Sequence, residues 1–567
     1  MAGKYIRIIS LLLVVTMLLS GCNGVDFEQL LGVVSSQLAT PFSDMEYIRP
    51  DMNKMEALLE ECCQQAQTQT DADALAEKAL EFYSAYNSFY TQYNLATIHY
   101  FKDLTDIYWE KEYTFCQGKV SAVESSLEEL FVTLAASPLR EELEENSAFG
   151  EGFFESYTGG GGLWNEAFSA LINQEAELEN RYLDLYAQAQ GIPAYSEEFF
   201  EKYSCPMGEL FVELIAVRQK IADYAGYQDY PSCAYDFYYY REYTPGEITK
   251  YLEEIRQELV PLYRLVESQG MFEEENAICR ETDMLDYVES AAKKMGGTVQ
   301  NAFLLMNQAK LYDITYSEKK YNGSFEVYLT DYYVPYVFVS PVGRQQDKLS
   351  FAHEFGHFCS DYAAGGSVAG VDVAEVFSQA MEYLSLCYGN EAGALEQLKL
   401  RDCLRVYVEQ AAYAQFEQRV YELKGDALTV ENVEKLYREI CLSYGFDAWP
   451  WDSRDYILIG HFFTDPMYII SYVVSNDAAL QIYQLEKQSP GAGLDLLEKQ
   501  LATQEGQLLA FLNAAGLKSP MESGRLTAVH KTLEEILMKN EGLLSSRSSF
   551  LIFVAPDKSA RRRYQRD

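Results

Sequence analysis

Apolar and polar residues alternate with a helical period over most of the chain. In residues 71–89, apolar side chains recur every three or four positions with charged residues between them, which predicts an amphipathic helix. Residues 244–247 read Thr-Pro-Gly-Glu, a capping box with proline at the first helical position. We expect a helix from there through Tyr263. The pattern therefore predicts a mainly α protein.

Residues 323–339 depart from this period. They are rich in aromatic and β-branched residues, which predicts two or three short strands. Pro335 interrupts the run, and because proline cannot donate a backbone hydrogen bond, it predicts that at least one strand lies at an edge. An edge strand could bind an extended peptide by backbone pairing. A hairpin that only packs the core explains the pattern equally well.

The first 21 residues have the features of a bacterial export signal. Lys4 and Arg7 precede an apolar stretch, residues 8–19, that is too short to span a bilayer comfortably. Residues 19–22 read Leu-Ser-Gly-Cys and resemble a lipobox, which implies cleavage before Cys22 and lipid attachment to it. We therefore expect an extracytoplasmic protein, lipid-anchored to a bacterial membrane through Cys22.

The remainder divides into four predicted parts. Residues 22–45 are predicted to be a lipidated tether, 46–230 an N-terminal helical region, 231–540 the catalytic region, and 541–567 a disordered tail that contains three consecutive arginines. The net charge of the 567-residue chain is -41, which disfavours nucleic acid as a partner. We expect a monomer.

Two of the five histidines bracket a glutamate in the run His353-Glu354-Phe355-Gly356-His357. On a helix, positions i and i+4 share one face, so both imidazoles can reach one metal ion. Zinc accepts imidazole nitrogen and carboxylate oxygen, and a catalytic zinc site keeps one position open for water. Glu354 is placed to take a proton from that water.

A third ligand is expected on a following helix. Glu375 is the best candidate, and Asp372 is the rival. Asp372 lies one turn before Glu375 and Glu382 two turns after it, so both could instead hydrogen-bond the ligand imidazoles and fix their tautomers.

With these residues in place, the chain resembles the thimet oligopeptidase and oligoendopeptidase F family of zinc peptidases. Residues 353–357 and 374–379 are the most specific part of the resemblance. Residues 323–343 are similar to the family's β-region, residues 461–472 to its histidine-and-tyrosine segment, and residues 514–520 to its closing loop.

The resemblance implies a role for each matched residue. His353, His357 and Glu375 would bind one zinc ion, and Glu354 would be the general base. The downstream donors that stabilise the transition state would be His461, Tyr468 and Tyr472; Ile470 stands where the family often has another tyrosine. The implied fold is two helical regions flanking a deep substrate channel, with a small β-region next to the zinc-binding helix.

The function expected from the sequence is a zinc-dependent oligopeptidase that hydrolyses internal bonds of short peptides by a metal-activated water. One alternative is a catalytically inactive peptide-binding lipoprotein of the same fold. Another is a related zinc exopeptidase that removes residues from a peptide end.

Overall fold

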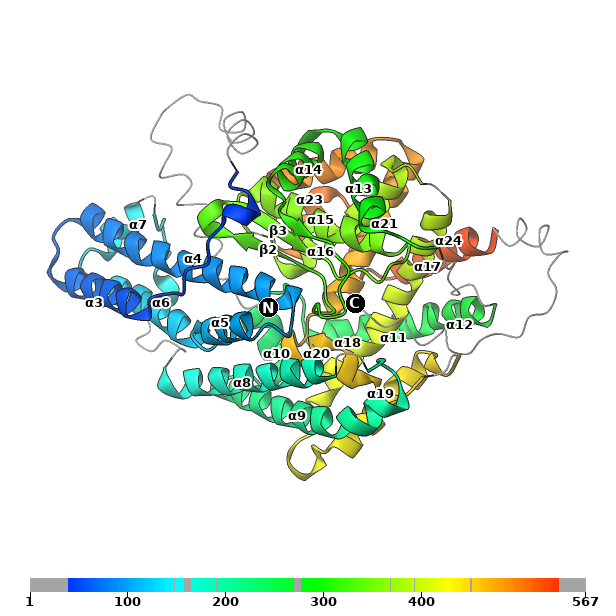
Figure 1. Ribbon diagram of the computed structural model, residues 1–567, viewed down its shortest axis with the longest axis horizontal. Helices are drawn as coiled ribbons and strands as arrows, with labels where there is room; N and C mark the ends of the chain where they lie inside the picture. Colours follow the sequence, from blue (N-terminus) through cyan, green and yellow to red (C-terminus); the bar gives the residue numbers. More distant parts are fainter. Residues whose placement is uncertain are drawn as a thin grey trace.

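The computed structural model describes residues 39–539, except residues 147, 158–164, 190–191, 270–276, 368, 392 and 449–450. Helices dominate it, and a small sheet lies beside α15, so the predicted mainly α fold with a small β-region is confirmed. Figure 1 shows α3 to α7 on one side of the molecule, α8 and α9 along the bottom, and α13 to α16 with the sheet above them.

Five of the seven N-terminal helices, all except α6 and α7, begin at a capping side chain. Asp51, Asp71, Asp106, Asn165 and Ser196 each accept hydrogen bonds from the first-turn N–H groups of the helix that follows. Because these N–H groups have no partner within the helix, the cap fixes the helix start. The helices of this region are α3 (Met52–Thr68), α4 (Ala72–Lys102), α5 (Ile107–Gln117), α6 (Val120–Ala135), α7 (Arg140–Glu145), α8 (Glu166–Gln188) and α9 (Glu197–Tyr224).

The rest of the described chain adds the sheet and the remaining helices. The helices up to the sheet are α10 (Tyr230–Cys233), the π-helix η4 (Ala234–Tyr238), α11 (Pro245–Glu258), α12 (Val260–Ser268), α13 (Glu281–Met295) and α14 (Gly297–Ala309). Those after it are α15 (Asp347–Ala364), α16 (Val371–Tyr388), α17 (Ala394–Arg405), α18 (Ala411–Val420), α19 (Val430–Ser443), α20 (Gly460–Thr464), α21 (Ile470–Gln488), α22 (Ala492–Thr503), α23 (Leu508–Ala515) and α24 (Arg525–Lys539).

Two predicted helices exist with different ends. The helix expected over residues 71–89 is α4, which continues to Lys102. The helix expected from residue 244 to Tyr263 starts with the predicted capping box on Thr244 and Glu247, but it divides at Leu259 into α11 and α12. Pro261 accounts for the break because it supplies no N–H to the helix and crowds the preceding turn.

The sheet has the order β1-β3-β2, with β1 (Tyr312–Asp313) parallel and β2 (Phe325–Leu329) antiparallel to β3 (Val334–Phe338). One strand of residues 323–339, β2, is an edge strand as predicted, but Pro335 lies in β3, the central strand, so the proline does not mark the edge. The N–H groups of Val337 and Val339 point toward the β1 side, and Pro335 shares their orientation. Since β1 pairs only with Val337 and Phe338, the missing N–H of Pro335 costs no ladder bond.

The signal segment, Cys22, most of the tether and the basic tail lie outside the described residues. At the end of the predicted tether, Phe42 packs on Tyr336 with ring centroids 4.3 Å apart, and Met45 is buried. These residues thus belong to the packed body. In the described part of the chain all ten cysteines are free, and no helix has the length and apolar character needed to cross a membrane.

Candidate functional site

The histidine motif lies in the middle of α15. The helix starts where the Asp347 carboxylate accepts hydrogen bonds from the N–H groups of residues 342, 343 and 344, at 3.0, 2.7 and 2.9 Å. It ends at Gly365, whose left-handed backbone (φ 67°) stops the helix. Asp347 thus ties the start of α15 to the preceding loop. The motif lies well inside the helix, with the His353 and His357 rings on one face, their centroids 5.0 Å apart.

Gly356, the fourth residue of the motif, is where α16 crosses α15. A Cβ atom at this position would lie 2.5 Å from the Cα of Ser378 and 2.8 Å from the carbonyl oxygen of Phe377. Only glycine permits so close an approach without moving one helix. This crossing brings Glu375, one turn before Ser378 on α16, to the two histidines.

His353, His357 and Glu375 converge, with one ligand atom from each lying within 4.8 Å of the others. Glu375 Oε2 is 3.3 Å from His353 Nε2, and Glu375 Oε1 is 3.8 Å from His357 Nε2. Two ligands of one tetrahedral zinc ion lie about 3.4 Å apart, given metal–ligand distances of about 2.1 Å. Two imidazoles and a carboxylate in this arrangement fit a zinc ion with a fourth position left open.

The electrostatics of the three residues are those of a cation site. Burial raises the pKa of Glu375, but the hydrogen bond and charge of His353 outweigh it, and the pKa falls to about 2. Burial lowers the pKa of His353, yet Glu375 and Glu382 outweigh it and the net shift is upward. Burial lowers the pKa of His357 to about 4. An ionised carboxylate is thus buried against two imidazoles.

Glu382 lies behind His353, where the sequence analysis placed it. Its Oε1 is 2.9 Å from His353 Nδ1, and its Oε2 is 2.8 Å from the ammonium of Lys399, whose side chain is buried. A carboxylate on Nδ1 holds the imidazole with Nε2 directed at the ligand cluster. Lys399, which neutralises Glu382, had no signal in the sequence because it comes from α17, outside any motif.

Asp372 does not contact either imidazole, so the prediction that it would do so is wrong. It accepts hydrogen bonds from Tyr243 at 2.7 Å and Ser471 at 2.6 Å, and it pairs with Arg241 at 3.4 Å. Asp372 lies one turn before Glu375 on α16, and Tyr243, Arg241 and Ser471 of α21 hold its side chain. The rival role as a ligand fails for the same reason.

The predicted donors gather next to the ligand cluster. The Tyr468 hydroxyl donates to Glu375 Oε1 at 2.6 Å, and His461 Nε2 lies 3.1 Å from the Tyr472 hydroxyl. The ring centroids of these three residues are 5.4–5.6 Å apart. Burial lowers the pKa of His461 to about 4, so its imidazole is neutral at pH 7. A neutral imidazole and two hydroxyls can each donate a hydrogen bond.

Glu354, which follows His353 on α15, is buried. Burial raises the pKa of Glu326 on β2, and the nearby carboxylates of Asp361 and Glu354 raise it further. Ser378, which was not predicted from the sequence, donates its hydroxyl to Glu375 Oε2 at 3.1 Å. Ser378 lies inside the matched segment 374–379, so that segment was the available signal. The structure thus brings together the six residues predicted as ligands or donors, and the predicted base Glu354 is next to His353 on the same helix.

One family model matches part of the N-terminal region of the chain. Residues 42–158 match the family model of the Peptidase M3 N-terminal domain. No curated protein sequence matches the chain. The matched domain and the solved structures of the same fold support a peptidase.

Solved structures share the fold over nearly their whole length. A structure assigned to oligoendopeptidase F has a TM-score of 0.77 at 20% identity, with 88% of this chain and 99% of that chain covered. PZ peptidase A with an inhibitor has a TM-score of 0.76 at 18% identity, with coverage of 88% and 99%. A protein from Bacillus anthracis, also assigned to oligoendopeptidase F, has a TM-score of 0.73 at 18% identity, with coverage of 88% and 98%. The solved structures therefore show the same fold, which agrees with the resemblance seen in the sequence.

Proposed function

We propose that this protein is a zinc-dependent oligopeptidase that hydrolyses internal bonds of short peptides. The observation that carries the proposal is the convergence of His353, His357 and Glu375 around a volume that fits one zinc ion, with Glu354 on the same helix. When bound, zinc would supply the positive charge that acidifies water and polarises the scissile carbonyl.

The protein's own residues would transfer the proton, stabilise the transition state and orient a ligand imidazole. Glu354 accepts the proton of the attacking water and passes it to the departing amine. His461 and a hydroxyl from Tyr468 or Tyr472 donate hydrogen bonds to the oxygen on which negative charge grows, each worth about 3 kcal/mol by comparison with oxyanion-hole deletions. Glu382 keeps His353 in the tautomer whose Nε2 faces the ligand cluster.

The test of Glu354 separates catalysis from metal binding. Glu354→Gln should retain one equivalent of zinc and lose about 10²- to 10⁴-fold in kcat, because the water then has no base. Glu77→Gln, at an exposed position on α4, is the matched control and should retain full activity. Zinc is measured by elemental analysis and cleavage with a quenched fluorescent peptide. Comparable kcat in Glu354→Gln would remove Glu354 from the mechanism.

Two further outcomes distinguish the alternative functions. Stoichiometric zinc without cleavage by the unmodified protein would point to a peptide-binding lipoprotein. Mass spectrometry of products from a peptide blocked at both ends tests the mode of cleavage. We expect internal fragments from the blocked peptide. If the protein cleaves only the same peptide with free ends, it is an exopeptidase.

We also propose that Cys22 carries the lipid anchor, on the pattern of residues 1–22. The expressed protein should partition into the detergent phase, and Cys22→Ala should partition into water. Equal partition of the two proteins would contradict the proposal that Cys22 carries a lipid. Short peptides remain the proposed substrates, and a channel between the helical regions would limit their size.

A further inference from the structure

Two buried arginines hold the segment that carries the donors His461 and Tyr468. Arg218 comes from α9, in the N-terminal half of the chain, and Arg241 follows the π-helix η4. Both use the planar guanidinium group on main-chain oxygens of residues 462–467. Neither residue contacts the ligand cluster or was indicated by a motif.

Arg218 caps the short helix α20, which contains His461. One of its terminal nitrogens donates to the carbonyl oxygen of Phe462 at 2.7 Å, and the other donates to that of Phe463. These carbonyls lie in the last turn of α20, where no partner within the helix is available. Arg218 is fully buried, and Glu175 neutralises it at 2.8 Å.

Arg241 holds the chain on both sides of Tyr468. Its terminal nitrogens donate to the carbonyl oxygen of Met467 at 2.9 Å and to the hydroxyl of Ser471 at 2.8 Å. Its guanidinium pairs with Asp372 and lies 4.4 Å from the centre of the Tyr239 ring. Its side chain is 1% exposed, so no water competes for these bonds.

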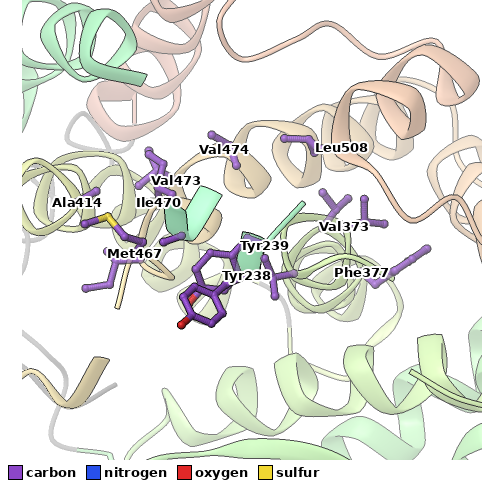
Figure 2. Close-up of a cluster of buried hydrophobic side chains, with 14 of the residues drawn as sticks. Tyr238, Tyr239, Val373, Phe377, Ala414, Met467, Ile470, Val473, Val474 and Leu508 are labelled. Atoms are coloured by element: carbon purple, nitrogen blue, oxygen red, sulfur yellow. The ribbon is translucent and has the colours of Figure 1, made fainter. Parts of the chain in front are cut away.

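The segment needs this support because Met467 has a left-handed backbone, φ 66°, which a non-glycine residue adopts only when its surroundings impose it. Glu417 accepts the N–H of Met467 at 2.8 Å, and the Tyr239 hydroxyl donates to the carbonyl of Pro466 at 2.8 Å. Figure 2 shows Met467 and Tyr239 within a cluster of buried apolar side chains. The turn sets the direction in which Tyr468 leaves the main chain.

We propose that Arg218 and Arg241 are positioning residues, a clamp that fixes the main chain of residues 460–471 so that His461 and Tyr468 face the ligand cluster. The proposal rests on the proposed function of these two donors. Each arginine binds two oxygens with one rigid fork, whereas lysine carries a point charge and cannot hold both acceptors in that geometry. Arg→Lys therefore removes the clamp and keeps the charge beside Glu175 or Asp372.

A double-mutant cycle tests whether Arg241 acts through Tyr468. Arg241→Lys should lower kcat about 10- to 100-fold with KM within about twofold, since displacement of a catalytic group by about 1 Å costs this much. In a Tyr468→Phe background the same substitution should cost less than about twofold, because the group it positions is gone. Equal losses in both backgrounds, or full kcat in Arg241→Lys or in Tyr468→Phe, would overturn the proposal for Arg241. Arg218→Lys with His461→Gln forms the parallel cycle.

Arg181→Lys is the matched control, since Arg181 forms an exposed pair with Glu213 between α8 and α9. It should leave kcat unchanged. If Arg241→Lys fails to fold, Ser471→Ala removes one acceptor of the same fork and should lower kcat in the same direction; unchanged kcat there would contradict the proposal.

Amide hydrogen exchange separates failure of the clamp from failure of the proposed function. Exchange in residues 460–471 should be faster in Arg218→Lys and Arg241→Lys, while the rest of the protein and the Arg181→Lys control exchange as the unmodified protein does. If the unmodified protein binds zinc and cleaves no peptide, the proposed function fails and exchange alone decides the clamp. Unchanged exchange in residues 460–471 would overturn it.

Discussion

Gly356→Ala tests whether the close crossing of α15 and α16 builds the site. The added Cβ would lie 2.5 Å from the Cα of Ser378 and 2.8 Å from the carbonyl oxygen of Phe377. Non-bonded carbon atoms pack at about 3.5 Å or more, so the helices must separate by about 1 Å. Both obstructing atoms are main-chain atoms, and no side-chain rotation can relieve the clash.

Gly356→Ala should change both the free energy of unfolding and the affinity for zinc. Overpacking costs about 1–3 kcal/mol of unfolding free energy, and replacement of glycine by alanine within a helix returns up to about 1 kcal/mol. We expect a net loss of about 1–2 kcal/mol. Separation of α15 from α16 also moves Glu375 from His353 and His357, and metal sites tolerate errors of only about 0.2 Å. Zinc affinity should therefore fall at least about tenfold.

The assays are urea unfolding and competition for zinc with a chelator of known affinity. Gly246→Ala is the control, because a Cβ there would lie 3.9 Å from the nearest atom, the Thr244 hydroxyl oxygen. It should be neutral or slightly stabilising and leave zinc affinity unchanged. Unchanged zinc affinity in folded Gly356→Ala would refute the reasoning that the crossing positions Glu375.

Three further predictions address individual side chains. Glu375→Ala should lower zinc occupancy in elemental analysis, and full occupancy would move the third ligand elsewhere. Lys399→Met leaves buried Glu382 without its cation and should cost about 3 kcal/mol in urea unfolding; wild-type stability would contradict the role of that pair. Glu124 has its pKa raised by burial from 4.5 to about 7. The folded protein therefore binds this proton more tightly than the unfolded chain, and stability should fall by up to about 3 kcal/mol as pH rises from about 4.5 to 7. Glu124→Gln should remove that part of the pH dependence, and an unchanged profile would show that Glu124 is not its source.

The local parts of the site could be predicted from sequence because its chemistry is encoded by spacing within single helices. The interval between His353 and His357 places both rings on one face whatever surrounds the helix. Glu382 could be predicted as a partner of an imidazole by the same kind of argument. The capping box on Thr244 and Glu247 formed because its hydrogen bonds join residues only three positions apart.

The remaining features depend on contacts between distant segments. Asp372 faces α21 because of how α16 packs, which its position in the sequence does not specify. The central strand tolerates Pro335 because β1 is too short to pair with this position. The sequence of β3 does not reveal the length of its partner strand. Arg218 and Lys399 reach their partners across the fold, at separations that no local pattern records.

Titration of the metal-free protein with zinc is the most direct test of the central claim, with hydrolysis of an end-blocked quenched peptide as the readout. If His353, His357 and Glu375 hold one catalytic ion, the rate should rise in proportion to added zinc and level off at one equivalent. Hydrolysis that proceeds fully without zinc, or no hydrolysis at any zinc concentration, would contradict the account.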